Sequence, residues 1–296
     1  MSSTADQDRL RTLAVRATTV RVSVRPGRGA LAEEPPLLLC NGIGASLEVL
    51  QPLVDALDPR RPVIRFDVPG VGGSPLPAFP YPLAALSSWV TALVARLGHR
   101  EFDVLGLSWG GGLAQQLALQ SRRRVRKVVL AATGTGCLMV PARPQVLARM
   151  LTPRRHRDQA YAATIAPLIY GGSMRTDPQR GADLLHAVTR AGPTRGYYYQ
   201  LAATAGWTSL PFLPLLRQPT LVLAGDDDPI IPLVNARVLA RLIPHAQLHV
   251  YHGGHLGILT ESDELAPVIE TFLSEPPEAA TIRRTAARSR NGAPHD

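Results

Sequence analysis

The chain has 296 residues, of which 45% are hydrophobic and 19% are charged, the balance of an ordinary globular protein. This composition excludes a wholly disordered chain, and the length suits one α/β unit with an insertion. Lysine and arginine number 32 against 23 aspartates and glutamates, and the net charge of +9 attracts nucleic acid, anionic membranes or anionic particle surfaces. No run reaches the ~18 apolar residues that a membrane-spanning helix needs.

The N-terminus and the cysteines point to an intracellular protein. The first eleven residues contain no apolar run, so no signal peptide is predicted and we expect a cytoplasmic protein. Two cysteines, Cys40 and Cys137, are too few for a disulfide framework and lack the paired spacing of a zinc site. Both are predicted to be buried free thiols.

The chain opens with two segments of alternating pattern, residues 12–17 and 20–25, followed by a turn at 26–29. They predict two antiparallel strands. Unbroken apolar runs of strand length follow, which is typical of parallel strands buried on both faces. These runs are residues 37–40, 63–66, 104–107, 128–131, 221–224 and 248–251. The sequence therefore predicts an eight-stranded, mostly parallel sheet.

Helical patterns alternate with these runs, each long enough to cross back over the sheet. They cover residues 47–57, 83–97, 111–120, 235–242 and 265–272. The expected fold class is α/β, with helices on both faces of the sheet.

The alternation stops between residues 134 and 214, where no strand is predicted. Large side chains are frequent there, and we expect a helical lid over a pocket, with about half of the aromatic residues serving only as packing. They are Met139, Met150, Met174, Tyr161, Tyr170, Tyr197, Tyr198, Tyr199, Trp207 and Phe212. The predicted division is an α/β core at 1–133 and 215–276, the lid at 134–214, and a disordered basic tail at 277–296.

A serine lies between two glycines where a buried strand leads into a helix, in Gly106-Leu107-Ser108-Trp109-Gly110. This is the nucleophile elbow pattern, in which small neighbours let the chain double back and the serine hydroxyl project into a cleft. Ser108 is therefore the predicted nucleophile. The start of the following helix brings N–H groups next to the negative charge that develops on the substrate.

A serine needs a base to take its proton and a carboxylate to hold that base, in the order serine, acid, histidine. The acidic loop after residues 221–224 holds Asp226, Asp227 and Asp228. Asp228 stands three residues after Gly225 and is the predicted acid, ahead of Asp227. Asp226 and Asp227 are expected to bind loop amides or to face water.

The last predicted strand leads into His252-Gly253-Gly254-His255 and then a helix. His255 follows the glycine pair and is the predicted general base. The spacing of His249, His252 and His255 raises metal ligation as an alternative, but alternation along a strand would send them to different faces. No metal and no cofactor are predicted.

An oxyanion hole needs two backbone donors, one after the nucleophile and one after the third strand. Trp109 supplies the first. The second is expected from Asn41-Gly42-Ile43-Gly44, with Ile43 as the donor. The glycine-rich stretch 67–74 is interpreted as structural turn chemistry.

Together these motifs resemble the intracellular depolymerases of medium-chain-length polyhydroxyalkanoates, bacterial storage polyesters, over residues 24–273. The resemblance is carried by residues 41–44, 66–74, 108–111, 169–172, 206–209 and 223–229. It implies an α/β-hydrolase fold with Ser108 as nucleophile, Asp228 as acid and His255 as base. One departure is visible, because relatives tend to have acidic residues where this chain has His252 and Gly253.

The function predicted from this resemblance is hydrolysis of the polyester to 3-hydroxy acids or oligomers through an acyl-enzyme. Alternatives are a carboxylesterase for smaller aliphatic esters and a 3-hydroxyacyl transferase, the latter disfavoured because its added His-x4-Asp motif is missing. A non-catalytic granule-binding protein is disfavoured by the complete triad. The expected partner is a polyester granule or a hydrophobic ester, with storage granules as a place of association, and no nucleic acid.

Overall fold

The computed structural model describes residues 9–16, 18–179, 183, 190 and 192–276. Eight strands form one sheet in the order β1-β2-β4-β3-β5-β6-β7-β8. Their bounds are β1 Arg9–Val15, β2 Thr18–Arg25, β3 Leu37–Cys40, β4 Val63–Phe66, β5 Phe102–Leu107, β6 Val125–Ala131, β7 Thr220–Gly225 and β8 Ala246–Tyr251. The pairs β1/β2 and β2/β4 are antiparallel and the others are parallel, which confirms the predicted sheet.

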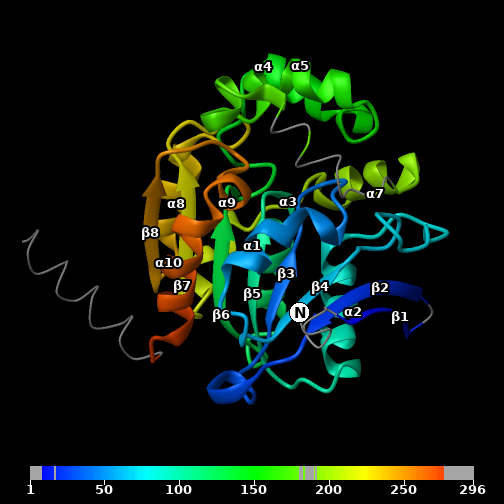
Figure 1. The fold of residues 1–296 in the computed structure, drawn as a ribbon, viewed down its shortest axis with the longest axis vertical. Helices are drawn as coiled ribbons and strands as arrows, with labels where there is room; N and C mark the ends of the chain where they lie inside the picture. Colours follow the sequence, from blue (N-terminus) through cyan, green and yellow to red (C-terminus); the bar gives the residue numbers. More distant parts are fainter. Residues whose placement is uncertain (1–8, 17, 180–182, 184–189, 191, 277–296) are drawn as a thin grey trace, which may run out of the picture.

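Helices cover both faces of the sheet (Figure 1). On one face lie η2 Leu47–Leu50, α1 Gln51–Ala56, α9 Gly257–Thr260 and α10 Ser262–Ser274, and on the other α2 Leu83–Arg96, α3 Trp109–Gln120 and α8 Leu233–Leu242. The alternation of side chains along β3 shows how two cores arise, because Leu37 and Leu39 join one cluster while Leu38 and Cys40 join the other. In the described ranges, no helix is both long and apolar enough to cross a membrane.

Three expectations at the sheet need correction. The first strand lies at Arg9–Val15, ahead of the predicted 12–17. The predicted helix 47–57 is divided into a 3-10 turn and a short α1. The predicted burial of the last strand on both faces is wrong, since Leu248 and Val250 are 37% and 43% exposed. The reason is that β8 is the edge strand, where the covering layers end.

The cysteine prediction holds for one residue of the two. Cys40 is buried in β3, and burial raises the pKa of its thiol. Cys137 is exposed, so the predicted burial is wrong there. Cys137 lies in the loop after β6, outside the sheet and both core clusters.

The chain between β6 and β7 forms short helices, of which α4 and α5 lie above the carboxyl ends of the parallel strands at the top of Figure 1. They are α4 Pro144–Met150, η3 Pro153–His156, α5 Gln159–Ile169, η4 Gly172–Arg175, α7 Thr194–Thr204 and η5 Leu210–Leu215. One further 3-10 turn, η1 Gly29–Leu31, follows β2. The predicted tail at 277–296 lies outside the described residues.

Candidate active site

Ser108 lies at the turn between β5 and α3, with φ 54° and ψ −116°. Such a positive φ is strained for a non-glycine residue and is characteristic of functional turns. The two flanking glycines make the turn possible. A Cβ at Gly106 would lie 2.3 Å from the Gly110 oxygen, and one at Gly110 would lie 2.1 Å from the Cys40 oxygen. Neither position admits a larger residue without movement of the backbone.

The side chains of Ser108, His255 and Asp228 form one hydrogen-bonded chain. His255 Nε2 lies 3.0 Å from Ser108 Oγ, and His255 Nδ1 lies 2.8 Å from Asp228 Oδ2. The histidine and aspartate side chains are only 5% and 1% exposed. Because an ionised carboxylate only accepts, Nδ1 carries the proton and Nε2 is left to accept from the serine hydroxyl. This is the arrangement that a serine nucleophile needs.

Asp228 is fixed from both sides. Its Oδ1 accepts from the backbone N–H groups of Ile230 and Ile231, each at 2.9 Å, while its Oδ2 receives His255. With both oxygens bonded and the side chain buried, the carboxylate has one orientation. It can therefore hold the imidazole of His255 in one tautomer.

The other two aspartates of the loop point elsewhere. Asp227 accepts from Arg175 at 2.6 and 2.7 Å and from the Gly172 N–H at 2.7 Å, and the arginine lowers the pKa of its carboxyl. Asp226 contacts His252 Nδ1 at 3.0 Å, and this hydrogen bond lowers the pKa of Asp226 and raises that of His252. Both bind loop groups, as the sequence suggested, and neither contacts His255.

The loop of His255 is held by a residue that sequence reasoning did not assign. The His255 N–H donates to the Tyr170 carbonyl at 2.7 Å, and the two rings stack with centroids 6.5 Å apart. Gly254 allows this approach, because a Cβ there would lie 2.0 Å from the same carbonyl. A main-chain contact has no signature of its own in the sequence, although residues 169–172 were among the resembling segments.

Two backbone amides next to Ser108 are left for an oxyanion. Within the described residues, the N–H groups of Ile43 and Trp109 have no hydrogen-bond acceptor. The amides around Ile43 are used internally: those of Gly42, Gly44 and Ala45 donate to Asn41 Oδ1, Gln200 Oε1 and the Gly42 oxygen at 2.8, 2.7 and 3.3 Å. Ile43 and Trp109 are thus the available donors on the two loops named by the sequence.

Two cavities meet at Ser108. The larger has a volume of about 280 Å³, and its lining includes Trp109, Met139, Trp207 and Ile231. The smaller has a volume of about 40 Å³ and is lined by Ile43, Met150, Tyr170 and His255 among others. The serine hydroxyl therefore faces an apolar space large enough for an aliphatic group on one side and a narrower space on the other.

Comparison with known proteins identifies the family to which the chain belongs. A family model described as the alpha/beta hydrolase fold matches residues 35–262. The chain belongs to this family. A curated relative, the poly(3-hydroxyalkanoate) depolymerase of Ectopseudomonas oleovorans, is 47% identical over 272 residues, which cover 92% of this chain and 95% of the relative. The predicted resemblance to such depolymerases is confirmed.

Other α/β hydrolases are more distant. The 3-oxoadipate enol-lactonase 2 of Acinetobacter baylyi is 27% identical over 243 residues, which cover 82% of this chain and 90% of the relative. Among solved structures, the enol-lactonase of Burkholderia xenovorans LB400 superposes with a TM-score of 0.76 at 25% identity and covers 90% of this chain and all of that one.

The large side chains of residues 134–214 are distributed unevenly in this α/β hydrolase. Met139 and Trp207 line the larger cavity at Ser108, and Met150 and Tyr170 the smaller. The other predicted aromatics of the segment line neither cavity. Tyr197 is buried, Tyr198 and Phe212 are largely exposed, and Tyr161 and Tyr199 lie between these extremes. Most of the aromatic content is therefore packing or surface.

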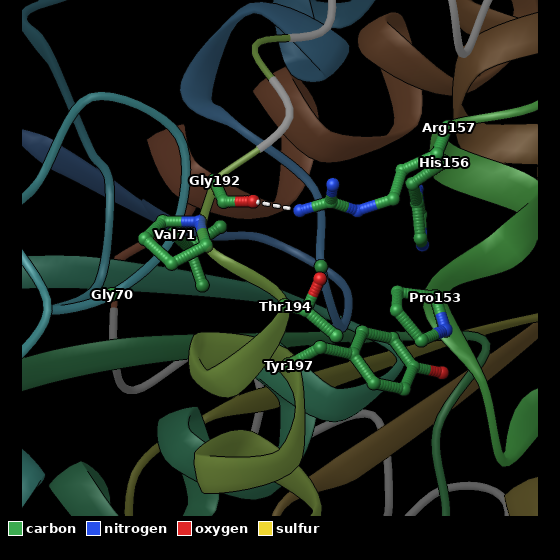
Figure 2. A pocket seen from close by; sticks show the side chains of 10 residues that line it. Gly70, Val71, Pro153, His156, Arg157, Gly192, Thr194 and Tyr197 are labelled. Atoms are coloured by element: carbon green, nitrogen blue, oxygen red, sulfur yellow. Dashed lines mark hydrogen bonds between the residues drawn. The ribbon is translucent and has the colours of Figure 1, made fainter.

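Tyr197 lines a third, separate pocket, shown in Figure 2 with Val71, Pro153 and Thr194. Across it, the Arg157 guanidinium points to the Gly192 carbonyl and donates to it at 2.5 Å. The pocket has a volume of about 20 Å³. This is room for about one water molecule, so it holds no substrate group.

Two of the three histidines raised as metal ligands bond to other side chains. His252 contacts Asp226, and His255 contacts Asp228 and Ser108. Among the described residues, no cluster of three or more histidine, cysteine, aspartate or glutamate side chains is arranged to hold a metal ion.

Proposed function

We propose that this α/β hydrolase is a serine esterase in which Ser108 is the nucleophile, His255 the general base and Asp228 the residue that orients it. The observation that carries the proposal is the continuous hydrogen-bonded chain from Asp228 through His255 to Ser108, which ends at the rim of a cavity of about 280 Å³. A buried, aligned set of these three groups is the recurring apparatus for activating a serine.

In the first half of the reaction, Ser108 Oγ attacks the ester carbonyl carbon while its proton passes to His255 Nε2. The carbonyl oxygen becomes an oxyanion that accepts from the Ile43 and Trp109 amides. The bond to the leaving oxygen then breaks, and that oxygen takes the proton from Nε2. An acyl-enzyme on Ser108 and a free alcohol result.

In the second half, water attacks the acyl carbon and gives a proton to His255. The tetrahedral intermediate uses the same two amides. When the bond to Oγ breaks, the proton returns to Ser108 and the acid is released. Asp228 stabilises the imidazolium in both halves, because its carboxylate lies 2.8 Å from Nδ1.

The proposed substrate is a medium-chain-length poly(3-hydroxyalkanoate), cleaved to 3-hydroxy fatty acids or oligomers. The 47% identity to a poly(3-hydroxyalkanoate) depolymerase over nearly the whole chain supports this choice. The lining of the larger cavity by Met139, Trp207 and Ile231 supports an alkyl chain next to Ser108. The enzyme would then act at storage granules in the cytoplasm.

We also propose that residues 134–214 are a lid over the catalytic edge of a core made of residues 1–133 and 215–276. The position of α4 and α5 above the strand ends (Figure 1) and the contacts of α7 with Gly44 and Trp109 support this division. Met139 and Trp207 of this segment share the larger cavity with Ser108. A lid of this kind would exclude water from the acyl-enzyme until the leaving group has departed.

The test is incubation of the purified protein with amorphous medium-chain polyester granules, followed by mass spectrometry of the released acids. We expect 3-hydroxy acids of about eight carbons with wild-type protein and none with Ser108→Ala. Granules of the short-chain polyester serve as the comparison substrate. Absence of acid from the medium-chain polymer, together with turnover of small esters, would contradict the polyester assignment while retaining the esterase.

One observation favours a second candidate, a carboxylesterase for smaller aliphatic esters. The cavity between Ile43 and His255 has a volume of only about 40 Å³, which leaves little room for a bulky leaving group. A polymer requires space on both sides of Ser108, whereas a small ester requires it on one. The granule experiment separates the two candidates, because only a depolymerase releases acid from the polymer.

A further inference from the structure

One residue of α7 contacts both loops of the candidate oxyanion hole. The side-chain oxygen of Gln200 accepts from the Gly44 N–H at 2.7 Å, and its main-chain oxygen accepts from the indole N–H of Trp109 at 2.8 Å. Since the Gly44 N–H can only donate, the amide oxygen of Gln200 must face it. Gln200 is 1% exposed, so solvent does not compete for these hydrogen bonds.

The two donors that need this contact come from distant parts of the chain. Ile43 follows β3, whereas Trp109 begins α3, and both N–H groups must point at one oxygen at about 2.7–3.1 Å. Gly44, the residue after Ile43, has a φ of +73°, and because it lacks a side chain its backbone can adopt more conformations than that of other residues. Its bond to Gln200 restrains the loop at the position next to the donor.

The helix that carries Gln200 is itself fixed by contacts with several neighbouring segments. Gly196 packs against the backbone of Gly70, where a Cβ would lie 1.7 Å from the Gly70 oxygen. One position further, the Tyr197 hydroxyl donates to the Met150 carbonyl at 2.5 Å and accepts from Arg155 Nη1 at 2.9 Å. The Tyr197 ring, seen in Figure 2, also packs against Gly44. Gln200 is thus held by contacts one turn away.

We infer that Gln200 is a positioning residue for the oxyanion hole, which makes the segment between β6 and β7 a determinant of turnover as well as of substrate binding. The inference rests on the proposed serine esterase. Gln200 does not touch the reacting atoms; it acts through the Gly44 amide and the Trp109 indole, and so through the two backbone donors beside them.

The decisive variant is Gln200→Met, which keeps the length and burial of the side chain and removes the acceptor for Gly44. Loss of one oxyanion donor typically costs about 10²–10³-fold in kcat, so a displaced donor is expected to cost about 10–100-fold. With p-nitrophenyl octanoate we expect kcat to fall by this factor and KM to stay within about threefold, since the ground-state ester makes weaker use of these donors.

A second readout separates positioning from loss of folded protein. Octylboronic acid forms a tetrahedral adduct with the serine and leaves an oxygen in the oxyanion hole, so its inhibition constant is expected to rise about as much as kcat falls. A smaller folded fraction lowers the apparent kcat but does not change an inhibition constant. Trp109→Phe, which removes the indole donor and keeps the Trp109 backbone amide, is expected to change both values in the same direction.

Gln218→Met is the matched control. Gln218 is buried too, and its Nε2 donates to the Ala118 oxygen at 2.9 Å, but it precedes β7 and so lies at the amino ends of the strands, opposite the candidate active site. We expect this variant to lower Tm and to leave kcat and the boronate constant unchanged. The inference is overturned if Gln200→Met stays within twofold of wild type in both values, or if the two variants behave alike. Wild-type protein that neither hydrolyses esters nor binds the boronate would contradict the proposed function itself.

Discussion

The catalytic edge of the sheet and the segment between β6 and β7 meet at Ser108, and they are built in different ways. At the sheet edge, Ser108, Asp228 and His255 each follow a parallel strand, so the register of β5, β7 and β8 brings them together. The β6–β7 segment reaches the site through single contacts, such as Gln200 with Gly44 across 156 residues. In the proposed esterase, the first region supplies the reacting groups, and the second positions the loops beside them.

The loop after β7, which holds Asp227 and Asp228, connects the sheet edge to the β6–β7 segment. Asp228 faces inward to His255, whereas Asp227 faces outward to Arg175 and Gly172 of the β6–β7 segment. In the proposed esterase, Asp228 therefore takes part in the chemistry, whereas Asp227 attaches the β6–β7 segment. Substitutions at these two positions separate the contributions of the two regions.

The largest effect is expected at the sheet edge. Ser108→Ala is expected to lower ester turnover by at least about 10⁴-fold, because the triad acts as a unit and the residual rate comes from binding and the oxyanion hole. Steady-state kinetics with p-nitrophenyl octanoate measure the loss, and circular dichroism checks the fold. A serine-directed phosphonate is expected to label wild-type protein at Ser108 alone.

Ser209→Ala serves as the control for that experiment. Ser209 is fully buried and its hydroxyl donates to Gln115 Oε1 at 2.6 Å, away from the triad. We expect lower thermal stability with full phosphonate labelling. Near-normal turnover of Ser108→Ala, or labelling of another serine, would show that the nucleophile assignment is wrong.

The next effect compares the two carboxylates. Asp228→Asn is expected to lower kcat by about 10³–10⁴-fold, because an amide no longer fixes the productive tautomer of His255 or stabilises its charged form. Asp227→Asn weakens the half-exposed contact with Arg175 and the hydrogen bond from the Gly172 N–H, both away from His255, and is expected to change kcat by less than about tenfold. Kinetics of both variants on one ester measure the difference. Equal losses would assign the acid role to neither residue alone.

A smaller effect tests the β6–β7 segment through chain length. Each buried methylene contributes about 0.8 kcal/mol, so two or three methylenes used in the transition state raise kcat/KM tenfold or more. Across p-nitrophenyl esters from acetate to laurate, we expect a maximum near eight carbons. Met139→Ala removes part of the lining of the larger cavity and is expected to flatten this profile severalfold. A maximum at acetate would favour the small-ester candidate.

The parts of the site that could be predicted from sequence depend on local geometry. Ser108 stands in a strand–turn–helix in which a side chain at Gly106 or Gly110 would clash with neighbouring backbone. The glycines of the sequence pattern are therefore a direct requirement of the turn. Asp228 and His255 follow strand ends at spacings that the loops enforce. Their hydrogen bonds to each other depend on the strand order, which the βα alternation largely determines.

The remainder depends on contacts that no local pattern encodes. Gln200 and the Tyr170 carbonyl reach the site because α5 and α7 pack against the catalytic loops, and neither residue type signals such a role. The apolar run of β8 predicted burial on both faces, but an edge strand with exposed Leu248 and Val250 has the same local sequence. Strand order, a global property, decides between the two.

The smallest expected effect concerns the exposed ion pair of His252 and Asp226, at the position where relatives were expected to differ. The hydrogen bond to Asp226 raises the pKa of His252, and the same bond lowers the pKa of Asp226. A raised histidine pKa contributes stability that is complete below the unfolded value of about 6.5 and is lost as pH rises through the folded value. A lowered aspartate pKa contributes stability above about 3.9 that is lost as pH falls through its folded value. The pair therefore stabilises the fold fully between about pH 4 and 6.5.

The His252 side chain is 97% exposed, so His252→Ala is expected to lower Tm by only about 1 °C at pH 5.5 and not at all at pH 9. Asp226 also accepts from the Gly253 N–H, and a double-mutant cycle with Asp226→Asn removes that contribution. A Tm difference of the same size at pH 9 would mean that His252 stabilises the base loop by packing and not by charge.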